Sequence, residues 1–368
     1  MRIGREALAV FAASVSLCGC GGMNHHSVPA RTAAVPSSPT TPAARFLARY
    51  VTGDGRVIRH DQGGDIVSEG QAYAMLVAEV AHRPALVRTV WSWTAAHLRR
   101  PDGLFAWHAT GSGKVEDPQS ATDADVLIAY ALLRYTGPDQ TALHAAGRQV
   151  AGAVFANESV ALPNGAPLLV AGPWAKSKTQ ATVDPSYLMP GVFQALARFT
   201  GDGRWNRAAT AAITLVRALT DDGRRLPPDW AQLSGGRLVA VAQPSGGAGV
   251  QYSLDAARVP IWFATACDES ARQLAASWWH NALSASRAGQ VALSLTGATI
   301  DPQTSPVGLL AGAAAAGAAG DEQAARGLRL RATALAVRSP TYYGDAWSAL
   351  GPALLDRAID PCQEAAHG

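Results

Sequence analysis

The chain carries little net charge and only a short apolar run near its start. Its 31 Lys and Arg residues nearly balance 28 Asp and Glu, so the formal net charge is +3. The basic residues are scattered rather than grouped, which removes any electrostatic reason to expect a nucleic-acid partner. The apolar run at residues 7–17 is too short to span a bilayer. Apolar residues nevertheless make up 48% of the chain, enough for a sizeable core.

Cysteine is scarce, with four residues in all, and two of them follow this run. Arg2 and Arg5 precede the run, an arrangement typical of a signal peptide. The next residues, Leu17-Cys18-Gly19-Cys20, resemble a bacterial lipobox in which Cys20 would be lipidated. We therefore expect a lipoprotein-type signal peptide at 1–19 and an exported protein, periplasmic or at the cell surface. The alternative is plain secretion, with incidental cysteines.

The other two cysteines, Cys267 and Cys362, would remain after cleavage. They could form one disulfide in an oxidising compartment, but their spacing does not establish it. Residues 20–44 are rich in Pro, Ser, Thr and Ala and lack an apolar period, which indicates a flexible tether. No second linker follows, so residues 45–368 are expected to form a single domain.

The pattern after the tether is overwhelmingly helical, and strand signals are sparse. Ala-rich segments with apolar residues three and four apart alternate with turns that contain Gly, Pro and Asp. These segments fall into six neighbouring pairs, which predicts an all-α (α/α)6 barrel of six helical hairpins, with short loop or hairpin excursions around an active-site cleft. An open helical solenoid ranks second, because no motif repeats at a fixed period. The helices are expected near 41–50, 68–82, 84–98, 121–136, 139–156, 186–200, 203–220, 253–266, 269–286, 305–318, 320–338 and 343–357.

One short motif places an acid in the first turn of a predicted helix. Ser68 and Gln71 have the spacing of a capping box, so Glu69 lies at a helix entrance. The helix dipole favours an acid there, which is a purely structural explanation. The dipole also lowers a carboxyl pKa, so Glu69 can act as a general acid only if burial or a second carboxylate outweighs it.

A second motif at residues 121–125 can supply that carboxylate. Asp123 shares a helix face with Leu127 and therefore points inward, while Asp125 points about 200° round the helix. With Thr122 as N-cap, an aspartate stabilised by the dipole explains Asp123 equally well. The two motifs together are more specific, because a pair of acids held across a cleft is the minimal equipment for splitting a glycosidic bond.

A third acid, Asp255, follows closely behind Ser253, which is a plausible N-cap. Taken by itself, Asp255 is explained by a local i, i+3 ion pair with Arg258.

The three motifs, SEGQAY at 68–73, ATDADVLIAYALL at 121–133 and SLDAARVP at 253–260, resemble glycoside hydrolase family 8 in order and approximate spacing. This is a family of inverting endoglucanases whose fold is an (α/α)6 barrel, and the likeness covers nearly the whole chain after the tether. The segment at 226–230, Leu-Pro-Pro-Asp-Trp, looks most like the periplasmic cellulases that accompany bacterial cellulose synthesis. Further matching segments are 54–57, 93–94, 104–107, 185–187 and 342–344.

The resemblance implies a role for each acid. Glu69 would donate the proton to the departing sugar oxygen, and Asp255 would be the base that activates water. Asp123 would touch the sugar at the cleavage point and help to keep Glu69 protonated. Inversion needs room for the water, so the carboxyl groups of Glu69 and Asp255 are expected roughly 6.5–9.5 Å apart. The family requires no metal or organic cofactor.

Aromatic side chains suit a glycan substrate, because the apolar faces of sugars stack on Trp and Tyr. Trp107, Trp174 and Trp230 fall in expected loops, where a binding role is favoured over a place in the core. The resemblance places Tyr187 and Arg258 near the substrate and the base. The predicted substrate-binding residues are Tyr73, Trp107, Tyr187, Trp230, Arg258, Tyr342 and Tyr343.

Two positions near the expected water or sugar depart from the family pattern. Leu254 stands where relatives usually have tyrosine, and Asp184 stands where many have asparagine. The main prediction is a monomer that cleaves β-1,4-glucan internally, anchored to a membrane only by lipid, with polysaccharide synthesis or export machinery as its partner. The alternatives are a relative acting on chitosan, xylan or mixed-linkage glucan, and a catalytically silent glycan-binding lipoprotein, at which Leu254 hints.

Overall fold

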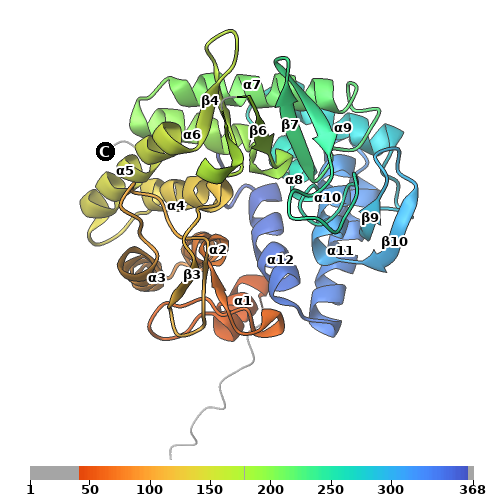
Figure 1. Cartoon of the computed structure of the whole chain (residues 1–368). Helices are drawn as coiled ribbons and strands as arrows, with labels where there is room; N and C mark the ends of the chain where they lie inside the picture. The colour runs from red at the N-terminus through yellow and green to blue at the C-terminus, as the bar shows by residue number, and fades with distance from the viewer. Residues whose placement is uncertain (1–40, 178, 364–368) are drawn as a thin grey trace, which may run out of the picture. The chain divides into compact units, whose positions relative to one another are not determined.

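The computed structural model describes residues 41–177 and 179–363. Within them the chain forms twelve α-helices, whose succession can be followed by colour in Figure 1. The helices are α1 (Pro42–Tyr50), α2 (Ser68–Val80), α3 (Pro84–His97), α4 (Thr122–Arg134), α5 (Gln140–Asn157), α6 (Pro190–Thr200), α7 (Arg204–Leu219), α8 (Arg258–Ala264), α9 (Glu269–Asn281), α10 (Pro306–Ala318), α11 (Glu322–Arg338) and α12 (Tyr342–Leu355).

Six of these helices form a closed inner ring. Helix α2 packs against α4, α4 against α6, α6 against α8, α8 against α10, α10 against α12, and α12 returns to α2. The other six alternate with them and pack outside: α1 on α12 and α2, α3 on α2, α5 on α4, α7 on α6, α9 on α8 and α10, and α11 on α10. The predicted (α/α)6 barrel is therefore confirmed, and the open solenoid is excluded because the last inner helix meets the first.

Burial separates the two layers. Twelve of the 13 residues of α4 are buried, and eleven of the 13 in α10. Only four of the 17 residues of α11 are buried, and these recur along one face at Ala325, Leu328, Ala332 and Ala336. A helix that is apolar all round must lie inside, whereas an apolar stripe suits a helix with one face in solvent. In these three helices the pattern of burial agrees with the layer in which each helix lies.

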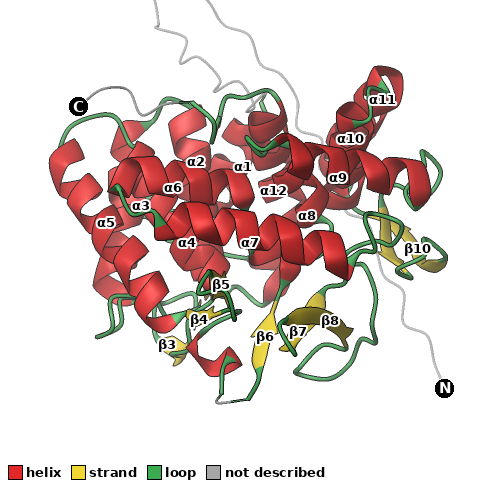
Figure 2. Cartoon of the chain, turned by 90° about the horizontal axis from the view of Figure 1, so that it is seen from above, coloured by secondary structure: helices red, strands yellow, loops and turns green. Residues whose placement is uncertain are grey.

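Ten short strands lie in the connections between helices and pair in four small antiparallel sheets. Figure 2 shows that β3 to β8 gather at one end of the helices. No helix in the described residues is long and apolar enough to cross a membrane. The strands are β1 (Ile66–Val67), β2 (His108–Ala109), β3 (Val115–Asp117), β4 (Ser159–Ala161), β5 (Pro167–Leu169), β6 (Ala181–Val183), β7 (Trp230–Ser234), β8 (Arg237–Val241), β9 (Gln290–Leu293) and β10 (Thr299–Thr304).

Most predicted helix bounds lie within two residues of the observed ones, with three exceptions. The helix expected at 253–266 begins only at Arg258, because the preceding residues form a turn that binds another loop. The helix expected at 186–200 is divided into a 3-10 turn, η3 (Pro185–Tyr187), and α6, which begins at Pro190. The helix expected at 269–286 ends at Asn281.

The predicted boundary between tether and domain falls inside α1. This helix begins at Pro42, where proline suits a first helical position, and Thr41 Oγ1 accepts a hydrogen bond from the Ala44 backbone at 3.1 Å. The boundary at 44/45 is therefore wrong by a few residues. The signal peptide, Cys20 and the rest of the tether lie outside the described residues.

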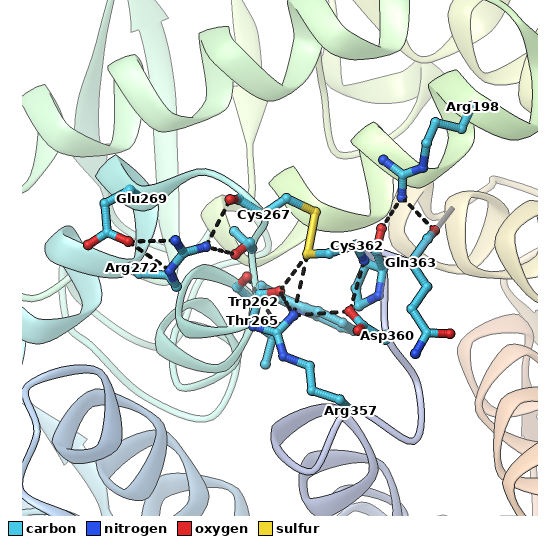
Figure 3. Close-up of a disulfide and its surroundings, with 12 residues drawn as sticks. Arg198, Trp262, Thr265, Cys267, Glu269, Arg272, Arg357, Asp360, Cys362 and Gln363 are labelled. Atoms are coloured by element: carbon cyan, nitrogen blue, oxygen red, sulfur yellow. Dashed lines mark hydrogen bonds and ion pairs between the residues drawn. A yellow bond between two sulfur atoms is a disulfide. The ribbon is translucent and has the colours of Figure 1, made fainter. Parts of the chain in front are cut away.

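A disulfide joins Cys267, just before α9, to Cys362, beyond α12, with their Cα atoms 5.3 Å apart (Figure 3). Arg272 Nη1 donates to the Cys267 carbonyl at 2.8 Å, and Arg357 Nη1 donates to the Thr265 carbonyl at 3.2 Å. Arg198, on α6, donates to the Pro361 carbonyl. The disulfide and the bonds of Arg357 and Arg198 tie the segment after α12 to the neighbouring helices. The cysteine spacing alone had left open whether this disulfide forms.

Replacing both bridged cysteines, Cys267→Ala with Cys362→Ala, is expected to lower the free energy of unfolding by about 2–5 kcal/mol, because the bond restrains a long loop in the unfolded chain. The sequence separation of the two cysteines is 95 residues. Urea denaturation monitored by circular dichroism measures the change. Reductant should destabilise the wild type to a similar extent and leave the double variant unaffected; equal stability of the two proteins without reductant would contradict this expectation.

Candidate active site

Three of the acids predicted to act together meet at one guanidinium. Arg258 Nη1 donates to Glu69 Oε1 and to Asp123 Oδ2, both at 2.8 Å, and Nη2 donates to Asp255 Oδ1 at 3.3 Å. Arg258 itself is only 3% exposed. The three carboxyl groups, far apart along the chain, are thus brought to one place, as the motifs together predicted.

The inner ring explains why these residues meet. Glu69 is the second residue of α2, Asp123 the second of α4, and Arg258 the first of α8. The starts of these inner helices face one another at one end of the ring. Tyr343, in the first turn of α12, joins them by donating its hydroxyl to the Leu254 carbonyl at 3.3 Å.

The two hydrogen bonds to the Glu69 carboxyl group both go to the same oxygen, Oε1. Tyr73 Oη donates to Glu69 Oε1 at 2.6 Å, and Arg258 Nη1 donates to the same oxygen. Burial raises the pKa of Glu69 to about 7; the guanidinium of Arg258 opposes this rise and the carboxylate of Asp123 adds to it. Burial therefore outweighs the cation, and Glu69 can hold a proton near neutral pH. Its side chain keeps 19% exposure, so the group still meets solvent.

Asp123 has a different setting. Its side chain is 4% exposed, Oδ1 accepts from the Ala124 backbone N–H at 2.8 Å, and Oδ2 accepts from Arg258. Burial raises its pKa, while the guanidinium and the Ala124 N–H oppose the rise. A short bond from a guanidinium favours the ionised form of a carboxyl group.

Asp255 is the most exposed of the three, with 45% of its side chain accessible. It lies in a turn before α8 that Asp229 holds in place. Asp229 accepts from the Ser253 backbone at 2.8 Å, from Ser253 Oγ at 2.6 Å and from the Ala256 backbone at 3.1 Å. The local ion pair between Asp255 and Arg258 is present, but it belongs to the larger cluster.

The expected helix caps are wrong in both motifs. Ser68 is the first residue of α2 rather than its N-cap, and Gln71 is fully buried. The Gln71 side chain accepts from the Val57 backbone at 2.7 Å and donates to Thr94 Oγ1 at 2.9 Å, so it fastens α2 to its neighbours. Thr122 Oγ1 donates to the Val170 carbonyl instead of capping α4. Tertiary partners replaced the local ones.

Two predicted substrate-binding tyrosines are core residues. Tyr73 is 0% exposed, and its hydroxyl binds Glu69. Tyr342 is 1% exposed and packs against Phe46 and Tyr50. Neither ring offers a face to a sugar, because α2 and α12 are buried almost all round. Both predictions of direct substrate contact are therefore wrong for this structure.

The other predicted aromatics keep accessible surface. The ring of Tyr187 lies against Arg258, with Cζ 5.4 Å from the ring centroid. Trp107 is 36% and Trp174 is 45% exposed, and Trp174 packs near Trp230 with 6.4 Å between ring centroids. These tryptophans lie in or beside the strand connections rather than on the inner helices.

The sequence analysis did not predict a second pair of buried acids, formed by Asp125 of α4 and Glu158 at the end of α5. Asp125 Oδ1 accepts from the Phe105 backbone at 3.0 Å, and Glu158 Oε1 accepts from Ser120 Oγ at 2.6 Å. Burial raises the pKa of Glu158 to about 7 and that of Asp125 well above its ordinary value, and the two carboxyl groups interact. Asp125 is part of the motif at 121–125. Glu158 directly follows α5, and nothing in the neighbouring sequence indicates that it is buried beside another acid.

The cluster at Arg258 also includes a fourth acid, Asp184, with Oδ2 3.5 Å from Nη2. The sequence singled it out only as a departure from a family pattern. In the described part of the chain, no group of three or more His, Cys, Asp or Glu side chains is placed to hold a metal ion.

Comparison with known proteins gives one consistent family. The model of the glycosyl hydrolases family 8 matches residues 31–350. A probable endoglucanase of Novacetimonas hansenii is 33% identical over 282 residues, which cover 73% of this chain and 79% of the relative. An endoglucanase of Cellulomonas uda is 30% identical over 241 residues, covering 64% and 65% of the two chains.

Solved structures agree with this assignment. The endo-beta-1,4-glucanase CMCax from Acetobacter xylinum superposes with a TM-score of 0.68 and 25% identity, covering 89% of this chain and all of that one, 100%. A beta-1,3-1,4-glucanase from Paenibacillus sp. X4 has a TM-score of 0.74 at 20% identity, covering 85% and 89%, and supports the fold. The closed ring of helices, the acids at its end and the match over most of the sequence lead to one conclusion: this chain belongs to glycosyl hydrolase family 8 and is a glycoside hydrolase.

Proposed function

We propose that this enzyme cleaves β-1,4-glucan chains internally with inversion, using Glu69 as general acid and Asp255 as general base. The observation that carries the proposal is the shared guanidinium of Arg258, which holds a half-buried carboxyl group, Glu69, and a more exposed one, Asp255, in a single cluster. The names of the relatives support the substrate, since several are endoglucanases.

Glu69 is suited to protonate the departing sugar oxygen. Tyr73 and Arg258 both donate to Oε1, so Oε2 is the oxygen that carries the transferable proton. The raised pKa of Glu69, about 7, keeps that proton on the carboxyl group in mildly acidic solution. The partial exposure of the side chain lets the proton reach a bound sugar.

Asp255 is suited to accept a proton from the attacking water. Its carboxyl group is the exposed member of the cluster, and the Asp229 turn fixes its position. Arg258 approaches it through a different nitrogen from the one that binds Glu69. A separation of roughly 6.5–9.5 Å between the two carboxyl groups, as inversion requires, remains a prediction.

Asp123 serves as the charged neighbour of the acid. Its carboxylate raises the pKa of Glu69, and Arg258 binds both groups at the same nitrogen. When positive charge develops on the sugar ring in the transition state, an ionised carboxylate beside the cleavage point stabilises it.

The substrate surface in this proposal is aromatic and lies on the connections between helices. Trp107 and Trp174 are exposed and Trp230 is half-buried beside Trp174, so their rings can stack on sugar faces. A glucan chain resting on such rings would pass the carboxyl cluster along its length, which suits internal cleavage. We propose that the glucan chain lies in a cleft lined by these rings and by the carboxyl cluster.

Export, lipid attachment at Cys20 and an association with polysaccharide synthesis or export machinery complete the proposal. The support is the N-terminal sequence, with Arg2 and Arg5 before the apolar run and cysteine at its end. The tether would leave the enzyme free to reach glucan chains close to the membrane.

Glu69→Gln is expected to reduce the release of reducing sugars from carboxymethylcellulose by about 10²–10⁴-fold, because the amide cannot donate the proton. Asp255→Asn should reduce it comparably, because the amide cannot accept a proton from water. The matched control is Glu269→Gln, which alters an exposed glutamate of α9 paired with Arg272. That control should keep wild-type activity; a wild type that binds the polymer without cleaving it would favour a silent binding protein.

The first sugar released from a β-1,4-glucan should carry the α-anomeric configuration, because water attacks from the face opposite to the leaving group. Proton NMR during the first turnovers, before mutarotation, distinguishes the anomers. Release of the β-anomer would mean retention and would overturn the role of Asp255 as a base.

Activity is expected to fall as the pH rises through about 7, because Glu69 with a pKa of about 7 must be protonated to act. The measurement is kcat/KM as a function of pH, which reports the free enzyme. Asp123→Asn should move this alkaline limb to lower pH, because the Asp123 carboxylate raises the pKa of Glu69. A limb that moves to higher pH in this variant would contradict the assignment.

A further inference from the structure

Asp184 faces the active-site cluster, yet the proposed mechanism does not use it. It lies between β6 and η3, and its side chain is 1% exposed. Oδ1 accepts from the Ser186 backbone at 2.8 Å and from Ser186 Oγ at 2.7 Å. Oδ2 lies 3.5 Å from Arg258 Nη2, the nitrogen that also approaches Asp255.

The charges around Arg258 do not balance if every acid is ionised. One guanidinium faces four carboxyl groups, those of Glu69, Asp123, Asp184 and Asp255. Buried like charges disfavour one another, so protons must be held in the cluster. Glu69 holds one in the proposed mechanism. Of the other three, Asp255 is open to solvating water, and Asp123 accepts a short bond of 2.8 Å from the guanidinium itself.

Distance and burial together single out Asp184 as the place of a second proton, because Asp255, at 3.3 Å from Nη2, keeps 45% of its side chain exposed to water. Charge-assisted bonds between a guanidinium and a carboxylate are about 2.7–2.9 Å long. Arg258 meets Asp123 at 2.8 Å but leaves Asp184 at 3.5 Å, although Asp184 is the more deeply buried. Burial and the carboxylate of Asp255 also raise the pKa of Asp184 well above its ordinary value, against the opposing guanidinium.

We propose that Asp184 is a neutral carboxylic acid and a positioning residue, which ties the η3 turn and the Tyr187 ring to Arg258 without adding a charge to the cluster. Tyr187 lies on η3 itself, and Arg258 is the first residue of α8. The neutral group fixes where the guanidinium lies, and the guanidinium in turn fixes Glu69 and Asp255. The positioning role rests on the proposed function, whereas the protonation state does not.

Stability as a function of pH tests the protonation state without any substrate. A carboxyl group whose folded-state pKa is raised loses stability as the pH rises above its unfolded value, because only the unfolded chain then releases the proton. Asp184→Asn lacks this loss. Its melting temperature relative to the wild type should therefore increase as the pH rises above about 4, the ordinary pKa of an aspartate in the unfolded chain. A difference that is constant or falls with pH would overturn the proposal.

The chain provides a matched control in Asp268, the N-cap of α9. Its Oδ1 accepts from the Ser270 backbone at 2.8 Å and from Ser270 Oγ at 2.7 Å, the same local geometry as at Asp184. Asp268 differs in its surroundings, since its bonds from Ser270 lower its pKa. For Asp268→Asn the melting temperature relative to the wild type should therefore fall with rising pH, with the sign opposite to Asp184→Asn.

Kinetics test the positioning role. Asp184→Asn keeps the shape and the acceptor for Ser186, while its amide nitrogen cannot accept from Arg258, so KM should stay close to wild type and kcat should fall only slightly. Asp184→Ala removes the link to Arg258, and kcat should fall about tenfold to a hundredfold with little change in KM. If that variant does not fold, Ser186→Ala can replace it: this substitution removes only the hydroxyl bond to Asp184, and kcat should fall by a smaller factor.

A loss of kcat in Asp184→Asn as large as in Asp184→Ala would show that the cluster needs a charge at this position, and would overturn the proposal. If the wild type cleaves no glucan, the proposed function fails, and the melting series still decides the protonation of Asp184.

Discussion

A single buried cation organises this enzyme. Arg258 contacts Glu69, Asp123 and Asp184 across separations of 189, 135 and 74 residues, and Asp255 three residues before it. Burying several carboxyl groups without a counter-charge is prohibitive, whereas a guanidinium has five donors in a rigid fork and can serve many acceptors. The closed ring of helices is what brings these partners together, because each approaches from a different inner helix or the connection before it.

At the start of α2, burial has a larger influence on the pKa of Glu69 than the charges around it. A helix N-terminus and a nearby guanidinium both favour an ionised carboxylate, and both act on Glu69. Burial nevertheless raises its pKa to about 7, and the repulsion from Asp123 is a smaller contribution than the attraction to Arg258. The protein thus obtains a protonated acid mainly by removing Glu69 from water. The second acid alone would not overcome the cation.

Two aspartates with the same local structure illustrate how far the surroundings decide chemistry. Asp184 and Asp268 each bind the backbone and hydroxyl of the serine two residues on, with equal distances. One lies among carboxyl groups in the interior and has a raised pKa, while the other caps a helix near the surface and has a lowered one. A turn motif therefore predicts a conformation but not a charge.

Sequence periodicity determined the helical fold, because spacings of three and four residues are local and the inner and outer helices differ in how far round they are apolar. The first two motifs paired Glu69 with Asp123, and the resemblance to a family added Asp255 to them. Tertiary structure alone decided the rest: it buried Gln71, Tyr73 and Tyr342, delayed the start of α8 through Asp229, and brought Asp184 and Glu158 among other acids. The physical reason is that burial and charge depend on neighbours far along the chain, whereas a sequence pattern reaches only the next turn of a helix.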